Sequence, residues 1–142
     1  MEYKSNSSIV YSCKYHVVWC PKYRRKVLVD KTAERLEELI KEKSSELQAD
    51  IIEMEVQPDH VHLLVEVDPQ FGVHKYIKQV KGYTSYIMRK EFAELTTKLP
   101  TLWTHSYFIS TVDKLDASSF SSPLSVIKQY IEKQARSQRE EK

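Results

Sequence analysis

Hydrophobic and polar residues alternate with a period of two in three stretches of the chain, which predicts three strands. These stretches are Ile9 to Cys20, Ile51 to Gln57, and His60 to Val67. A fourth strand is predicted from Trp103 to Val112, where three adjacent aromatic and aliphatic residues interrupt the alternation. Such an interruption allows both faces of that strand to be covered.

The alternation assigns side chains to faces. On the first strand, Val17 and Trp19 belong to the apolar face, and Lys14 and His16 to the polar face. On the second strand, Ile52, Met54 and Val56 are expected to point one way, with Glu53 and Glu55 pointing the other way. A turn at Gln57-Pro58-Asp59 then leads directly into the third strand, so the second and third strands are expected to form a hairpin.

Apolar residues recur at helical spacing in three other segments, which predicts helices at about 30–48, 73–92 and 124–138. Pro123 is well placed in the first turn of the last helix, and the serine-rich segment 113–123 before it is expected to be a loop. The order strand, helix, strand, strand, helix, strand is typical of the ferredoxin-like, split βαβ fold. The sequence therefore predicts a single α+β domain over 1–142, with an antiparallel sheet, helices on one face and an added C-terminal helix.

Composition agrees with one globular domain. The chain has 142 residues, of which 41% are hydrophobic and 30% charged. No apolar run reaches the ~18 residues of a membrane span, and the first residues lack the apolar segment of a secretory signal. A cytoplasmic protein is expected, and Cys13 and Cys20 suit reduced, packed thiols there.

Charge is segregated along the chain although the net charge is only +2. Segments 3–29 and 69–90 contain no acidic residue, whereas acids gather between Asp30 and Glu55. A basic side and an acidic side are typical of a protein that binds a polyanion such as nucleic acid. Solvated helix faces would give the same pattern, but tyrosines among the second set of lysines also suit stacking on unpaired bases.

The third strand carries two histidines on one side. His60 and His62 share a face with Leu64 and Glu66, while Val61 and its apolar neighbours occupy the other face. Two imidazoles one strand repeat apart, at ~6–7 Å, can converge on one cation. They can equally be polar residues on a wet sheet face, and the alternation alone leaves both interpretations open.

Two residues of the last predicted helix bear on this question. Tyr130 and Gln134 lie four positions apart, hence one turn apart on the same helix face. A tyrosine can serve as a covalent nucleophile and a glutamine oxygen as a metal ligand, although a tyrosine beside isoleucines can also simply pack. With only Gly72 and Gly82 in the chain, there is no glycine-rich phosphate loop, and no nucleotide cofactor is expected.

The combination of Gln57-Pro58-Asp59-His60-Val61-His62-Leu63 with Tyr130-Ile131-Glu132-Lys133-Gln134 resembles the single-tyrosine HUH transposases, and more narrowly the small TnpA-type insertion-sequence transposases. The block Lys14 to Arg25 is similar to the opening of that family. The blocks Lys81 to Ser85 and Leu102 to Phe108 are similar to its middle. The resemblance covers nearly the whole chain.

The resemblance implies a metal-dependent enzyme that cleaves and rejoins single-stranded DNA. His60, His62 and Gln134 would hold one divalent ion, Mg²⁺ or Mn²⁺, and Tyr130 would attack the phosphorus to form a 5′-phosphotyrosine link. Asp59 is explained equally well as a turn residue or as an acceptor that orients a histidine. His16 is expected to be structural or to contact DNA.

The resemblance also implies a homodimer, with the tyrosine helix of one subunit often completing the histidine site of the other, and DNA targets that form hairpins. We expect DNA backbone contacts from six basic residues: Lys22, Arg24, Arg25, Lys75, Lys78 and Lys81. Two alternatives are a hairpin-cleaving relative that does not transpose and a non-catalytic nucleic-acid-binding module.

Overall fold

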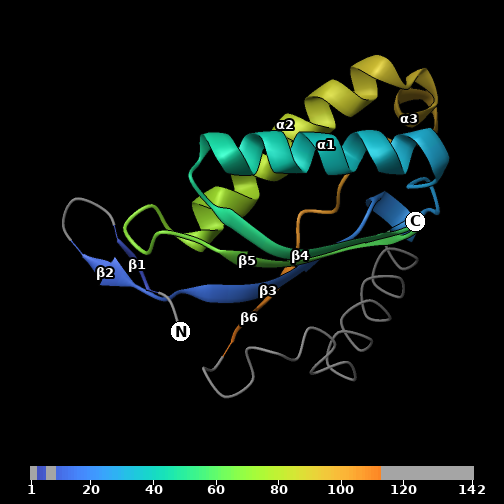
Figure 1. Cartoon of the computed structure of the whole chain (residues 1–142). Coiled ribbons are helices and arrows are strands. Elements are labelled where there is room, and N and C mark those ends of the chain that lie inside the picture. Colours follow the sequence, from blue (N-terminus) through green and yellow to red (C-terminus); the bar gives the residue numbers. More distant parts are fainter. Residues whose placement is uncertain (1–2, 6–8, 113–142) are drawn as a thin grey trace.

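A four-stranded antiparallel sheet carries two long helices on one face (Figure 1). In this computed structural model, the described residues are 3–5 and 9–112. The elements of the domain are β3 (Lys14–Trp19), α1 (Asp30–Glu46), β4 (Asp50–Gln57), β5 (His60–Glu66), α2 (Val73–Glu91) and β6 (Phe108–Thr111). The strand order is β4-β5-β3-β6, which confirms the predicted ferredoxin-like arrangement. The loop 113–123 and the helix 124–138 predicted from the sequence lie outside the described residues.

The predicted long first strand is wrong in its first half. It divides into β2 (Val10–Tyr11) and β3, and β2 pairs with β1 (Lys4–Ser5) in a separate two-stranded sheet. The last β3–β5 pair joins Lys14 to Glu66, so the described residues before Lys14 are not paired with a strand of the main sheet. Ile9, which the alternation assigns to the apolar face, is accordingly 37% exposed.

The core lies between the sheet and the helices. Val17 and Trp19 from β3 and Leu63 from β5 are fully buried there, together with Leu36 of α1 and Ile77 of α2. Complete burial of such a side chain stabilises the fold by roughly 1.5–3 kcal/mol. The apolar face predicted for β3 and β5 is therefore the face that receives the helices.

A bulge in β4 corrects one face assignment made from the sequence. Ile51 pairs with Val65 and Glu53 pairs with Leu64, so the register shifts between them and Ile52 is left over. Ile52 is 43% exposed, while Ile51 packs against the core with Met54. A strict period of two cannot reveal this shift, because one extra residue on a strand reverses every face before it.

The fourth strand, β6, is shorter than predicted and begins at Phe108. Trp103 lies outside β6 and forms an isolated antiparallel bridge with Pro21. Its ring packs edge-on against Trp19, with ring centroids 5.8 Å apart, and its Nε1 donates to Thr84 Oγ1 on α2 at 3.1 Å. Phe108 packs with Val18 on the face away from the helices. The predicted cover on both faces of this strand is confirmed, since Ile109 packs against the main core.

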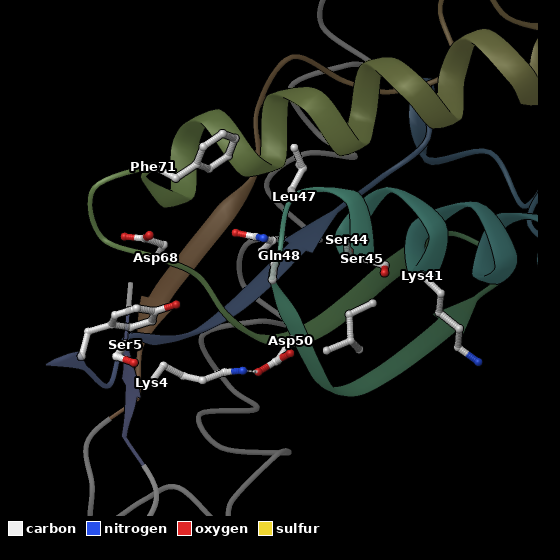
Figure 2. Close-up of a pocket in the computed structure, with 13 residues that line it drawn as sticks. Lys4, Ser5, Lys41, Ser44, Ser45, Leu47, Gln48, Asp50, Asp68 and Phe71 are labelled. Atoms are coloured by element: carbon white, nitrogen blue, oxygen red, sulfur yellow. Dashed lines mark ion pairs between the residues drawn. The ribbon is translucent and has the colours of Figure 1, made fainter. Parts of the chain in front are cut away.

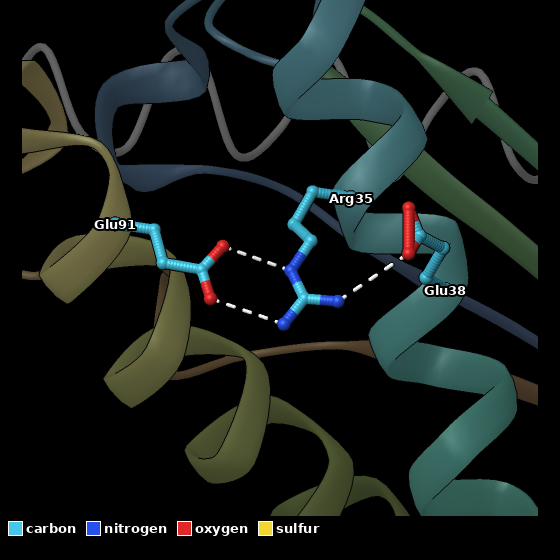
Figure 3. Close-up of polar contacts among 3 residues, drawn as sticks. All are labelled: Arg35, Glu38 and Glu91. Carbon is cyan, nitrogen blue, oxygen red and sulfur yellow. Dashed lines mark hydrogen bonds and ion pairs between the residues drawn. The ribbon is translucent and has the colours of Figure 1, made fainter.

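An ion-pair cluster joins the two long helices at the surface (Figure 3). Arg35 of α1 donates from Nε to Oε1 of Glu91 at 2.8 Å and from Nη2 to Oε2 at 3.0 Å, and it also contacts Glu38. A short helix, α3 (Ala93–Lys98), and a 3₁₀ turn, η1 (Lys22–Arg24), complete the described elements. Among the described helices, none combines the length and the apolar character that crossing a membrane requires.

Candidate active site and nucleic-acid surface

The histidines of β5 lie on the sheet face away from α1 and α2. His62 is paired with Val18 on β3, and His16 is paired with Leu64, so both rings project on the same side. His16 Nδ1 and His62 Nε2 are hydrogen-bonded at 3.2 Å, and both residues are buried. The polar faces of β3 and β5 thus lie on the same side of the sheet, and His16 is a direct neighbour of the site.

Burial determines the charge of His62. The pKa of its imidazole is lowered to about 4, chiefly because the ring is buried and further because His16 and His60 lie nearby. His62 is therefore neutral near pH 7, which is the form of histidine that binds a metal ion.

His60 is oriented by the residue before it. Its Nδ1 lies 2.9 Å from Oδ1 of Asp59, and the other oxygen of Asp59 accepts a hydrogen bond from Arg24 Nε at 2.8 Å. Burial alone would raise the pKa of Asp59, but the hydrogen bonds from Arg24 and His60 outweigh it and lower that pKa. Asp59 therefore accepts from a histidine, which is one of the two roles the sequence left open.

These features fit a site for a divalent ion. In neutral His60 the contact with Asp59 leaves Nε2 as the nitrogen with a lone pair, and His62 is held neutral. Within 3–5 and 9–112, no three His, Cys, Asp or Glu side chains are grouped closely enough to hold a metal by themselves. The pair therefore requires a further ligand, and the predicted one, Gln134, lies outside the described residues, as does Tyr130.

Two side chains on β4 adjoin the histidines and were missed from the sequence. Glu55 is paired with His62 and Gln57 with His60, so both lie on the histidine face, where Gln57 donates a hydrogen bond to Glu55. Counting outward from the tight turn between the two strands would have found them, because residues equally far from such a turn face the same side.

The six basic residues predicted to contact DNA fall into two groups. Lys22, Arg24 and Arg25 lie at or next to η1, where Lys22 sits over the ring of Tyr23 and Arg25 is exposed. Arg24 is paired with Asp59. The structure thus brings Arg24 into the histidine site and leaves Arg25 at the surface.

The second group lies on α2. Lys75 and Lys78 are exposed, whereas Lys81 is partly buried and donates to the carbonyl oxygens of Thr104 at 2.7 Å and Ser106 at 3.3 Å. Burial lowers the pKa of Lys81 to about 8. Lys81 therefore holds the segment that leads into β6, a contact that the sequence pattern did not predict.

A groove of about 720 Å³ runs between α2 and the segment 101–107. Its size is in the range of ligand sites, ~300–1,000 Å³. Among the described residues, no acidic side chain lines it. The lining residues are His74, Lys75, Lys78, Lys81, Gly82, Ser85, Thr101, Trp103, Thr104, His105 and Tyr107. The groove is thus complementary in charge to a polyanion.

Another cavity, of about 780 Å³, lies between the end of α1 and the β1–β2 hairpin (Figure 2). Lys4 and Asp50 form an ion pair at its edge, and Asp68 and Phe71 line it. Asp50 pairs with Glu66, at the opposite end of β5 from His60, so the cavity is ~20 Å from the first histidine along the strand. The described residues of its lining are of mixed charge and include no histidine, so the candidate chemistry lies elsewhere.

Residues 9–134 match the protein family described as "Transposase IS200 like". The chain belongs to this family. It is 35% identical over 136 residues to the ISDra2 transposase TnpA of Deinococcus radiodurans, and the matched region spans 94% of this chain and 92% of that protein. It is 29% identical over 113 residues to the transposase for insertion sequence element IS200 of Salmonella typhimurium, covering 78% and 74% of the two chains. The resemblance seen in the sequence is confirmed.

Solved structures agree with the fold of this IS200-like transposase. A crystal structure of a Deinococcus radiodurans protein matches with a TM-score of 0.78 and 33% identity, over 92% of this chain and 97% of that one. A REP-associated tyrosine transposase bound to a REP hairpin matches with a TM-score of 0.56 and 12% identity, over 80% and 64% of the two chains. The second likeness is one of fold.

Proposed function

We propose that this IS200-like transposase cleaves and rejoins single-stranded DNA in a metal-dependent reaction, with Tyr130 as the nucleophile. The observation that carries the proposal is the pair His60 and His62 on one face of β5, with His60 oriented by Asp59 and His62 neutral. In a chain of this family, such a pair is suited to bind a metal ion at the reaction centre.

Cleavage would proceed by exchange of one phosphate ester for another. The oxygen of Tyr130 would bond to the phosphorus as its hydroxyl proton is released, and the bond from phosphorus to the 3′ oxygen would break. The products are a 5′-phosphotyrosine and a free 3′-OH, once that oxygen takes up a proton. A Mg²⁺ or Mn²⁺ ion held by His60, His62 and Gln134 would polarise the phosphate and offset the negative charge that develops.

Rejoining would be the reverse reaction with a different strand. A 3′-OH attacks the phosphotyrosine, a phosphodiester forms, and Tyr130 is released with its hydroxyl restored. No nucleotide cofactor is needed, because each step replaces one phosphate ester with another.

DNA is expected to bind along the groove beside α2. Its lining within residues 3–5 and 9–112 is basic and lacks acidic residues, and Lys75 and Lys78 are exposed there. Gly82 supports this placement, because a glycine inside a helix is destabilising and a Cβ atom at this position would meet no atom within 4 Å. Packing within the described chain therefore gives no reason for glycine, whereas the close approach of a ligand would give one.

Since a structural neighbour was solved with a hairpin, we propose DNA that contains a hairpin as the substrate.

We further propose that the transposase acts as a homodimer, with composite sites in which the Tyr130 helix of one subunit serves the histidines of its partner. Mixing a Tyr130→Phe chain with a His60→Ala chain would restore cleavage if the sites are composite, and would leave the mixture inactive if each chain completes its own site.

The decisive experiment is covalent capture. Labelled single-stranded DNA with a hairpin is incubated with the full chain and Mg²⁺ or Mn²⁺, and a labelled band that survives denaturing electrophoresis reports the phosphotyrosine. Tyr130→Phe, His60→Ala and His62→Ala should each abolish the band, as should EDTA. Tyr86→Phe is the matched control for Tyr130→Phe, because Tyr86 is 67% exposed and is not among the residues that line the groove.

Three outcomes would contradict the proposal in different ways. An adduct in Tyr130→Phe would show that another residue is the nucleophile. DNA binding without any adduct under either metal would favour a non-catalytic binding module. Cleavage without joining, on a substrate with two labelled strands, would favour a hairpin-cleaving relative.

A further inference from the structure

Two residues far apart in the chain meet beside His60. Arg24 belongs to η1, after β3, and Asp59 belongs to the turn between β4 and β5. Arg24 Nε lies 2.8 Å from Oδ2 of Asp59, and His60 Nδ1 lies 2.9 Å from Oδ1 of the same carboxylate. The Asp59 side chain is only 15% exposed. Each oxygen of Asp59 thus has its own partner in a sheltered position.

The backbone around Arg24 is strained. Tyr23 has φ 60° and Arg24 has φ 50°, in the left-handed region that residues with a Cβ atom seldom occupy. Neighbouring hydrogen bonds fix this conformation: Lys22 N donates to Leu102 O and Arg24 N donates to Pro21 O, both at 2.8 Å. Strain of this kind persists where the surrounding contacts enforce it, and it is common at functional sites. Here the strained turn brings the guanidinium of Arg24 to Asp59.

The chemistry of the contact assigns the hydrogen on His60. A carboxylate only accepts hydrogen bonds, so Nδ1 of His60 must be the donor to Asp59, and in the neutral ring Nε2 is then the nitrogen that keeps a lone pair. Arg24 in turn holds the carboxylate in place from the other side. Without Arg24, the Asp59 side chain could rotate toward solvent and His60 could exchange its hydrogen between the two ring nitrogens.

We propose that Arg24 and Asp59 form a positioning pair, which fixes the ring orientation and the tautomer of His60 so that Nε2 is presented to the metal ion. This inference rests on the proposed metal-dependent function. It assigns Arg24 to the metal site instead of to the DNA backbone contacts expected from the sequence, and it leaves Arg25, exposed at the next position, as the DNA-contacting candidate of this turn.

The test compares Arg24→Met with Arg25→Met, two neighbouring changes that remove the same charge. Mn²⁺ affinity of the full chain is measured by calorimetry without DNA. We expect Arg24→Met to weaken Mn²⁺ binding severalfold and Asp59→Ala to weaken it by about 10- to 100-fold, the usual range for partners of metal-bound histidines. Arg25→Met should leave it unchanged. Arg24→Lys, which keeps a charged donor, should recover part of the affinity and controls for misfolding of the turn.

Two further measurements separate positioning from DNA contact. Nitrogen NMR of the metal-free chain should show His60 with its hydrogen on Nδ1 in the wild type and in Arg25→Met, and a mixture of tautomers in Asp59→Ala. DNA affinity without metal should fall in Arg25→Met and stay at the wild-type level in Arg24→Met.

The inference would be overturned if Arg24→Met and Arg25→Met had equal Mn²⁺ affinities, or if the tautomer of His60 were the same in Asp59→Ala as in the wild type. A different result would contradict the proposed function. If the wild type bound no Mn²⁺, the metal-dependent reaction would be wrong, while the NMR comparison would still decide whether Asp59 fixes the tautomer of His60.

Discussion

Replacing Lys75, Lys78 and Lys81 by methionine, one at a time, should separate two roles that look identical in the sequence. The first two side chains are exposed beside the groove, whereas Lys81 donates to the carbonyls of the segment before β6. Lys75→Met and Lys78→Met should each reduce the slope of log K against log salt by about 0.7 to 0.9, the effect of one lost phosphate contact. Their free energy of unfolding should stay close to that of the wild type.

Lys81→Met should show the opposite behaviour. Its ammonium donates to carbonyl oxygens at 2.7 and 3.3 Å, and hydrogen bonds from a charged donor contribute about 1.5–3 kcal/mol net. Methionine keeps the apolar stem but leaves the carbonyl of Thr104, a buried residue, without this donor. We therefore expect a loss of about 1.5–3 kcal/mol in the free energy of unfolding and an unchanged salt slope.

The assays are urea denaturation and fluorescence anisotropy with labelled hairpin DNA over a salt series, both at pH 7. At that pH Lys81 is still charged, because its pKa of about 8 lies above it. Lys90→Met is the matched control, since Lys90 is an exposed lysine of the same helix that does not line the groove. A Lys81→Met chain of normal stability with a reduced salt slope would show that Lys81 contacts DNA and would refute the assignment made from its carbonyl contacts.

Substitutions at three further positions test the groove and the core beneath the histidines. Gly82→Ala should raise the free energy of unfolding by about 0.5–1 kcal/mol, since the position is helical and open. Gly82→Trp should weaken DNA binding in the anisotropy assay, because the indole ring would occupy the groove. Equal DNA affinity of the two variants would argue against DNA at this site. Thr84→Val should cost about 1–3 kcal/mol in urea denaturation because it leaves the buried Trp103 Nε1 without an acceptor, and Thr84→Ser, which keeps the hydroxyl, should be more stable than Thr84→Val. Leu63→Ala should cost about 2–5 kcal/mol by opening a cavity behind β5, and a smaller loss would mean that the neighbouring helices close over the gap.

The sequence by itself determined the features that depend on local periodicity. The order of strands and helices, the apolar faces of β3 and β5, and the common side of His60 and His62 all follow from side-chain spacing along a single element. The succession of elements then allowed few topologies, so the ferredoxin-like order could be predicted before any contact was known. Family membership was recognisable because its blocks are short, ordered segments.

Only the tertiary structure decided how residues from different elements meet. The pairing of β3 with β5 places His16 against His62. The bulge in β4 places Ile51, instead of Ile52, on the core face. Arg24 and Lys81 read as equivalent members of basic runs, yet one lies at Asp59 and the other at backbone carbonyls. Charge along a chain shows that a residue is basic, but the partner of that charge depends on which segments the fold brings within hydrogen-bonding distance.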